Sequence, residues 1–234
     1  MNSEINRIRE EMGMPNIKQK WLCNNKDDFP KLLLIRELNT NLSKYYSVDE
    51  TYSLEEYIDA VTKNIYLILE LLSEMNVYPQ YFMDLTMDMH EENYICQKKS
   101  GTIGSHIDDT INNTYDGKVA EAIKNKRYKS QAQVGEARNI EYYFDRMIDF
   151  CQKNKISFGI DNEEDIKTIF EECILSSSIK NEDLLISATE IDEIEAITEL
   201  LYCYLCFFVK LGINPSDYLN AYMNEKLGLS NVKK

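Results

Sequence analysis

The sequence predicts an all-α fold built from a duplicated helical hairpin, and three observations support this. Only four prolines and eight glycines occur among 234 residues. Strong helix formers fill the segments that carry an apolar stripe of helical period. The stretch from Ile65 to Pro79 is echoed without a gap from Leu201 to Pro215, at an offset of 215 − 79 = 136 residues. The offset aligns Tyr66 with Tyr202, Val77 with Ile213, Phe82 with Tyr218 and Met87 with Met223.

A single hairpin of this kind cannot bury its apolar stripe alone. Two copies are therefore expected to pack as one bundle about a pseudo-twofold axis, with any ligand site built from both halves. The boundaries we expect are a first repeat over 1–96, a loop and basic linker over 97–136, and a second, diverged repeat over 137–234.

Four helices are expected in the first repeat. The first runs from Ser3, a good N-cap, to Gly13, and the second follows Asp27-Asp28-Phe29-Pro30. The third starts at Ser53, which forms a capping box with Glu56, and ends near Met75. The fourth runs from Pro79 to about Asn93. The apolar stripe of the second helix is Leu32, Leu33, Ile35, Leu38 and Leu42, and that of the third is Tyr57, Val61, Ile65, Ile68 and Leu72.

The segment from Gln97 to Gly117 lacks apolar periodicity and contains Gly, Asp, Asn, Ser and Thr residues. We expect a long surface loop here, which makes it a candidate lid or ligand-binding segment.

A cluster of basic residues follows this segment in an otherwise acidic chain. It consists of Lys118, Lys124, Lys126, Arg127, Lys129 and Arg138, and Lys98 and Lys99 precede the loop. Two interpretations stay open: a solvated linker between the repeats, or side chains that meet the phosphates of a small anionic ligand.

The second repeat is expected to contain four helices, over Ile140–Lys153, Asn162–Ser178, Thr189–Leu211 and Pro215 to about Leu227. Nothing in their pattern predicts a separate fold.

Charge and composition narrow the class of partner and the compartment. A net charge of −14 disfavours nucleic acid polymers and anionic membranes. The six cysteines lack the spacing of a disulfide framework, which favours reduced thiols and a cytoplasmic location. Cys203 and Cys206 are one turn apart, and we interpret them as core residues rather than as half of a metal site. The polar N-terminus and the absence of a run of about 18 apolar residues predict neither a signal peptide nor a membrane span.

Several motifs resemble the all-α NTP pyrophosphatase superfamily, specifically its MazG-like and phosphoribosyl-ATP pyrophosphohydrolase-like members. They are Ile8-Arg-Glu-Glu-Met-Gly-Met-Pro15, Leu33-Leu-Ile-Arg-Glu37, the hairpin Ile65–Pro79, His90-Glu-Glu-Asn93 and Asp116-Gly-Lys-Val119. The tandem hairpins resemble the arrangement of dimeric dUTPases. The resemblance implies a helical bundle in which a Glu-x-x-Glu helix and a Glu-x-x-Asp helix bind Mg²⁺ and activate water to cleave a nucleotide between its α and β phosphates.

The first repeat departs from this pattern. Glu37 is present, but Thr40 stands three residues later, and Ala60 and Lys63 occupy the places of the second acidic pair. Lys63 would repel Mg²⁺, although Asp59 compensates if the register shifts by one residue.

The second repeat keeps more acids. Glu171 and Glu172 correspond to Glu37, and Asp192, Glu195 and Glu199 share one helix face. These acids are either the solvated face of an amphipathic helix or a metal site formed by Glu172, Glu195 and Glu199, with Asp192 and Glu37 as further candidate ligands.

Three hypotheses follow. The first is a protein that binds or sequesters a small phosphorylated nucleotide with weak or no hydrolysis, such as a phage protein that captures a nucleotide signal. Its candidate ligand-binding residues are Lys63, Asn93, Lys98, Lys118, Lys126 and Arg127. The second is an active Mg²⁺-dependent NTP pyrophosphohydrolase, and the third is a helical interaction protein without a small ligand. The duplication makes a homodimer plausible in all three cases.

Overall fold

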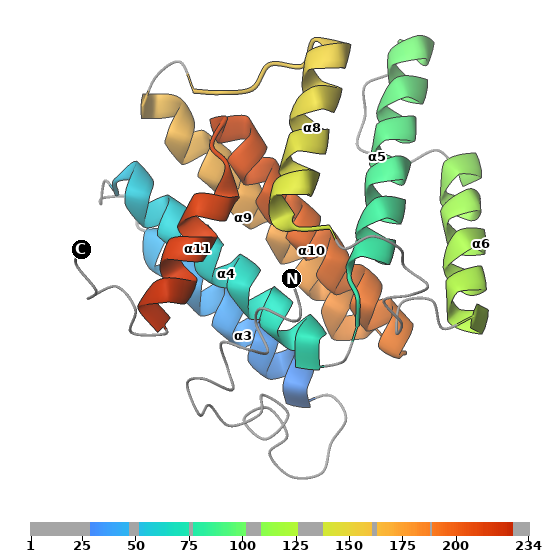
Figure 1. Ribbon diagram of the computed structural model, residues 1–234, viewed down its shortest axis with the longest axis horizontal. Helices are drawn as coiled ribbons and strands as arrows, with labels where there is room; N and C mark the ends of the chain where they lie inside the picture. Colours follow the sequence, from blue (N-terminus) through green and yellow to red (C-terminus); the bar gives the residue numbers. More distant parts are fainter. Residues whose placement is uncertain are drawn as a thin grey trace.

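The computed structural model describes residues 29–46, 52–74, 77–101, 109–125, 138–160, 163–187 and 189–226. Within these ranges the secondary structure is entirely helical, which confirms the all-α prediction (Figure 1). The helices are α3 (Phe29–Ser43), the short 3-10 helix η1 (Lys44–Tyr46), α4 (Leu54–Glu74), α5 (Gln80–Ser100), α6 (Asp109–Asn125), α8 (Ile140–Asn154), α9 (Glu163–Ile186), α10 (Glu190–Leu211) and α11 (Pro215–Lys226). The helix predicted over Ser3–Gly13 lies outside the described residues.

Local capping explains where several helices begin. The predicted capping box of α4 is present: the Ser53 N–H donates to Glu56 over 2.9 Å, and the Glu56 N–H donates to the Ser53 hydroxyl over 3.3 Å. Thr189 and Asp192 form the same reciprocal pair at the start of α10. The predicted apolar stripe of α4, from Tyr57 to Leu72, is at most 3% exposed at every position.

The two hairpins pack crosswise. In each hairpin, the long first helix contacts the second helix of the other: α4 packs against α11, and α10 packs against α5. The two first helices also contact each other, and α3 and α9 pack against their outer sides and against one another (Figure 1). The pseudo-twofold relation between the halves stays a prediction.

The same hydrogen bond closes both turns. The Val77 N–H donates to the Leu72 carbonyl over 2.9 Å, and the Ile213 N–H donates to the Phe208 carbonyl over 3.1 Å. Both donor and acceptor are shifted by 136 residues (213 − 77 and 208 − 72). Gly212 ends α10 in the left-handed region at φ 69° and lies against the backbone of Gly159, so a side chain there would be strained and crowded.

The surface loop predicted from Gln97 to Gly117 is wrong at both ends. Gln97–Ser100 form the last turn of α5, and Asp109–Gly117 belong to α6, which packs against α5. The buried residues of α6 are Ile111, Tyr115, Val119 and Ala122. They provide about one apolar side chain per turn, which is too sparse for a periodicity argument to detect.

Helix α9 is also longer than predicted, because it continues past Ser178 to Ile186. Its inner face there carries polar residues: Ser177 and Asn181 are buried, and the Asn181 amide donates to Asn39 of α3 over 3.0 Å. Because these polar residues interrupt the apolar period, the sequence predicted that the helix ends at Ser178.

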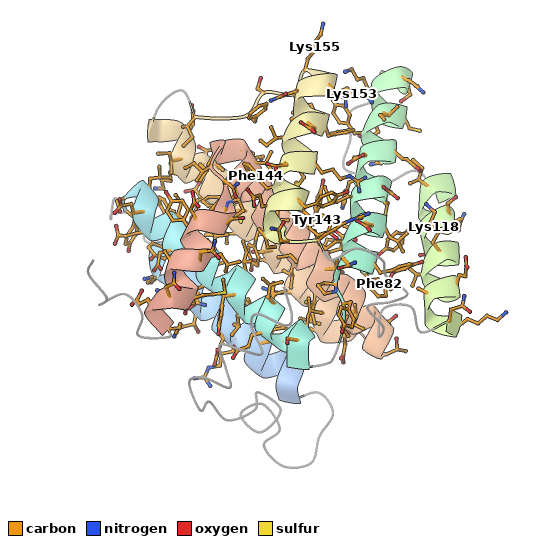
Figure 2. All side chains as sticks on the ribbon, viewed as in Figure 1. Phe82, Lys118, Tyr143, Phe144, Lys153 and Lys155 are labelled. Atoms are coloured by element: carbon orange, nitrogen blue, oxygen red, sulfur yellow. The ribbon has the colours of Figure 1, made fainter. Side chains whose placement is uncertain are left out.

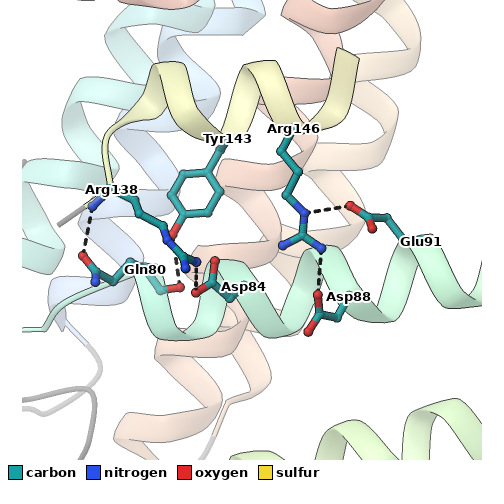
Figure 3. A network of polar contacts seen from close by, with 7 residues as sticks. All are labelled: Gln80, Asp84, Asp88, Glu91, Arg138, Tyr143 and Arg146. Carbon is teal, nitrogen blue, oxygen red and sulfur yellow. Dashed lines mark hydrogen bonds and ion pairs between the residues drawn. The ribbon is translucent and has the colours of Figure 1, made fainter. Parts of the chain in front are cut away.

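Helix α8 is fastened to α5 by polar side chains (Figure 3). Arg146 donates to Asp88 over 2.7 Å and to Glu91 over 2.9 Å. Arg138 forms an ion pair with Asp84, and the Tyr143 hydroxyl donates to the Gln80 carbonyl over 3.1 Å. From Tyr143 with Gln80, through Arg146 with Asp88 and Glu91, to Asn154 with Lys98, the contacts advance along both helices, so α5 and α8 run parallel.

In the described part of the chain, no single helix is long and apolar enough to span a membrane. The bent pair α10 and α11, whose axes turn by 116°, passes that test by length and composition only.

Candidate ligand-binding groove

Three neighbouring cavities lie along the face of α10 that points toward α5. The first, about 340 Å³, lies between α5, α8 and α10, and we call it the aromatic cavity. The second, about 540 Å³, lies between α5, α9 and α10, and we call it the lysine cavity. The third, about 420 Å³, lies between α5, α6, α9 and α10, and we call it the acidic cavity. The aromatic and lysine cavities together are named the α10 groove.

The aromatic cavity has mainly apolar walls. Rings from three helices contribute to them: Tyr94 from α5, Phe150 from α8 and Tyr202 from α10. Met87 and Met147 complete the apolar lining, and flexible methionine side chains adapt to irregular partners. Such a recess suits a planar aromatic group.

The lysine cavity is more polar. Lys180 of α9 and Lys210 of α10 line it, together with Ser176 and the acids Glu172 and Glu199. Lys210 forms an ion pair with Glu172, and both side chains are about half exposed (49% and 54%). The lysine cavity therefore offers two cationic donors whose present partners are carboxylates of the same chain.

His90 and Tyr202 mark the junction between the two parts of the α10 groove, since both line both cavities. Their rings stack, with centroids 4.3 Å apart and planes inclined by only 4°. His90 Nε2 lies 3.2 Å from Glu199 Oε2, and Lys180 Nζ lies 3.8 Å from the same oxygen. Burial raises the pKa of the Tyr202 hydroxyl well above its usual value, so Tyr202 stays neutral at neutral pH.

The acidic cavity is lined by Asp183, Asp192, Glu195 and Glu199, with Lys180 among them. The pKa of the Glu195 carboxyl is raised to about 7, chiefly by burial; the charges of nearby acids add to this shift, and the hydrogen bond from Tyr115 opposes it. Glu195 is thus partly protonated near neutral pH.

The predicted metal ligands are brought together only in part. Glu172 and Glu199 share the lysine cavity, but Glu195 and Asp192 face the acidic cavity. Asp192 also caps α10, and Glu37 is half-buried on α3 and lines none of the three cavities. Within the described ranges, no three His, Cys, Asp or Glu side chains are grouped so that they could hold a metal ion.

The interpretation of these acids as a purely solvated helix face does not hold throughout. Glu199 is only 9% exposed, and Glu195 is half-buried. Asp192 is exposed, as that interpretation predicts.

Of the predicted phosphate-binding residues, Asn93 lies in the α10 groove and lines both of its cavities. Lys63 lies on α4 and donates to Asp59 over 2.6 Å. Lys98 donates to the Asn154 carbonyl over 2.8 Å, where it joins α5 to the end of α8. Lys118 lies on α6 at the edge of the molecule (Figure 2). Lys126 and Arg127 lie outside the described residues.

Sequence reasoning missed Lys180, Lys210 and the role of His90. A signal was present for Lys210, because it lies within the echoed stretch Leu201–Pro215, on the helix that also carries Glu199 and Tyr202. A single lysine near a helix end is, however, also typical of a solvated helix terminus.

Cys203 and Cys206 line the lysine cavity, where both are half-buried. Burial raises the pKa of Cys206 to about 12, so this thiol stays protonated at neutral pH. The two cysteines behave as small apolar wall residues.

Comparison with protein-family models, with curated proteins and with solved structures found no match to this chain. The resemblance to the all-α NTP pyrophosphatase superfamily therefore stays a prediction.

Proposed function

We propose that the α10 groove binds a small phosphorylated nucleotide. The observation that carries this proposal is the direct contact between an aromatic recess and a recess with two lysines, which share His90, Asn93, Tyr202 and Lys210 in their walls. A nucleotide combines the same two chemistries, since its base is planar and apolar on its faces and its phosphates are anionic. The aromatic cavity accepts the base, and the lysine cavity accepts phosphate oxygens.

The existing ion pairs do not oppose this. Exposed pairs such as Glu172 with Lys210 contribute about 0–1 kcal/mol to stability, so a phosphate that offers more oxygens and more charge can displace the carboxylate. Displacement leaves Glu172 free to turn into water, because it is about half exposed.

The charge distribution favours a small anion over a polymer. The chain as a whole carries a net charge of −14, which repels extended polyanions, while Lys180 and Lys210 place two cationic donors in one recess, each beside a carboxylate.

Isothermal titration calorimetry with nucleoside mono-, di- and triphosphates of all four bases tests the proposal. Lys210→Ala is expected to weaken the tightest ligand by about tenfold, the loss of one charge-assisted hydrogen bond. The matched control is Lys153→Ala, an exposed lysine at the end of α8 that lines none of the cavities. Equal affinity of both variants, or no binding by the unaltered protein, would contradict the proposal.

Glu172→Gln separates binding from the alternative, Mg²⁺-dependent hydrolysis. If Glu172 competes with phosphate for Lys210, the variant binds the nucleotide about 3 to 10 times more tightly. If Glu172 holds Mg²⁺, the variant loses Mg²⁺-dependent pyrophosphate release instead. Pyrophosphate release by the unaltered protein that disappears in Glu172→Gln would establish the hydrolase.

A further inference from the structure

The positive charges of the α10 groove form two separate stations. The first, the Lys180 station, is Lys180, which lies 3.3 Å from Asp183 and 3.8 Å from Glu199, with the His90 ring beside the same Glu199 oxygen. The second, the Lys210 station, comprises Lys210 with Glu172. Each station consists of a cationic side chain held by a carboxylate from a neighbouring helix.

Helix geometry separates the two stations. Glu199 and Lys210 are 11 residues apart on α10, which corresponds to about 16 Å along the helix axis. On α9, Glu172 and Lys180 are 8 residues apart, or about 12 Å. Because α9 and α10 pack side by side, both helices place the stations at different levels of the same groove.

The aromatic cavity opens between these levels. Tyr202 and Cys206 line both cavities and lie between Glu199 and Lys210 in the order of α10. A planar group in the aromatic cavity therefore has one cationic station on each side.

Resting on the proposed function, we infer that the ligand carries phosphate groups at two separate positions that flank a nucleoside, as in a nucleoside 3′,5′-bisphosphate or a dinucleotide. The phosphates of a nucleoside triphosphate form one chain at one end of the ribose, so they occupy one station and leave the other paired with its carboxylate. With two separated phosphates, Lys210 turns from Glu172 to one phosphate, and Lys180 turns from Glu199, which keeps its contact with His90, to the other.

The test compares four probes by calorimetry at fixed ionic strength: AMP, ATP, adenosine 3′,5′-bisphosphate and the dinucleotide pApA. The bisphosphate or pApA is expected to bind at least about tenfold more tightly than AMP and more tightly than ATP, since a second charged contact is worth about that factor. Whichever of the two binds more tightly identifies the spacing that the stations accept.

Lys180→Gln and Lys210→Gln locate the contacts. Each is expected to weaken the two-phosphate ligand about 5 to 10 times, and the double variant is expected to show the product of both effects. For ATP, only one of the two substitutions is expected to matter. Lys153→Gln serves as the control and leaves all affinities unchanged.

Tighter binding of ATP than of both two-phosphate probes overturns the inference and leaves the proposed function standing. So does a two-phosphate ligand that responds to only one lysine. Absence of binding by every nucleotide overturns the proposed function instead. If Lys180→Gln does not fold, the order of the four probes on the unaltered protein still decides.

Discussion

Two helix faces related by the 136-residue offset differ in what surrounds them: one makes direct side-chain contacts, and the other lines cavities. On α4, the face toward α11 carries Asp59, Lys63 and Tyr66, and on α10, the face toward α5 carries Glu195, Glu199 and Tyr202 at the equivalent positions. On the first face, Lys63 and Tyr66 contact side chains of α4 and α11. Lys63 pairs with Asp59 one turn away, and Tyr66 is 5% exposed with its ring against Tyr222 of α11.

The second face lines three cavities, and the difference lies in the partner helices. Helix α11 has 12 residues, whereas α5 has 21 and brings His90, Asn93 and Tyr94 over α10. Helix α8 lines the aromatic cavity and is held to α5 by ion pairs and by the contact between the Phe150 and Tyr94 rings. The comparison teaches that one helix crossing forms a direct ring contact and the equivalent crossing forms a groove, depending on which side chains the second helix supplies.

The largest effect on the free energy of unfolding is expected at a core position where α4 and α10 differ. Asn64 of α4 is fully buried and equivalent to Leu200 of α10; its amide donates to the Leu38 carbonyl and to the Tyr204 hydroxyl, and it accepts from Asn41. Asn64→Ala removes these three hydrogen bonds from the core and is expected to lower the free energy of unfolding by about 3 kcal/mol. Urea denaturation measures this. The control Asn41→Ala, at a half-buried position, should cost about 1 kcal/mol, and equal costs would contradict the assignment.

Lys63 and Glu199 occupy equivalent positions on α4 and α10, and substituting each of them tests the comparison directly. Glu199 is 9% exposed, so Glu199→Gln removes a largely buried partner of His90 and Lys180 and is expected to cost about 2 kcal/mol. Lys63→Met breaks a pair whose side chains are 34% and 46% exposed, and it should cost less than about 1 kcal/mol. Thermal unfolding of both variants gives the ranking, and a larger cost for Lys63→Met would refute it.

The fastening of α8 to α5 predicts a smaller, salt-dependent effect. Arg146→Met keeps the aliphatic stem but loses both carboxylate contacts, and it is expected to destabilise the protein by about 1.5 kcal/mol at low salt. The loss should shrink in 1 M NaCl, because the contacts are partly exposed and screened. Lys167→Met, which breaks the exposed pair with Glu171, is the control and should have almost no effect. A salt-independent loss would point to packing instead of charge.

The smallest effect on stability is expected at Glu195, which is equivalent to Asp59 of α4. Its pKa in the folded protein, about 7, lies above the ordinary value of 4.5, so the folded state binds more protons between these values. Stability conferred by the protonated carboxyl is full below about pH 4.5 and is lost as the pH rises to about 7. Glu195→Gln is therefore expected to stabilise the protein by about 1 kcal/mol at pH 8, after allowance for solvent screening, and not at pH 4. Denaturation midpoints at both pH values check this, with exposed Glu225→Gln as the control.

The fold was predictable where local signals agree. Helix α4 carries a capping box and a complete apolar stripe, so its limits and buried residues were predicted correctly. Helix α6 begins within a polar stretch that contains Asp, Asn, Thr and Gly residues, and it packs against α5, so its first half looked like a loop in the sequence.

The candidate site was predictable in part. Asn93 and Glu199 were recognised because each belongs to a motif, and both line the α10 groove. Lys63 was predicted to contact phosphate, but it lies on the opposite hairpin face beside Asp59. Whether a lysine lines a recess depends on which helices cross above it, and spacing along the chain does not contain that information.

Helix type, helix limits and the two equivalent turns are thus encoded locally, because capping, helix propensity and apolar period act over a few residues. The 136-residue echo also indicated which faces correspond. Tertiary packing alone decided that cavities open along the α10 face, whereas on the α4 face Tyr66 packs against Tyr222 and Lys63 pairs with Asp59. This difference depends on the lengths of α5 and α11 and on the polar contacts between α5 and α8. These contacts join residues more than 50 positions apart in the chain.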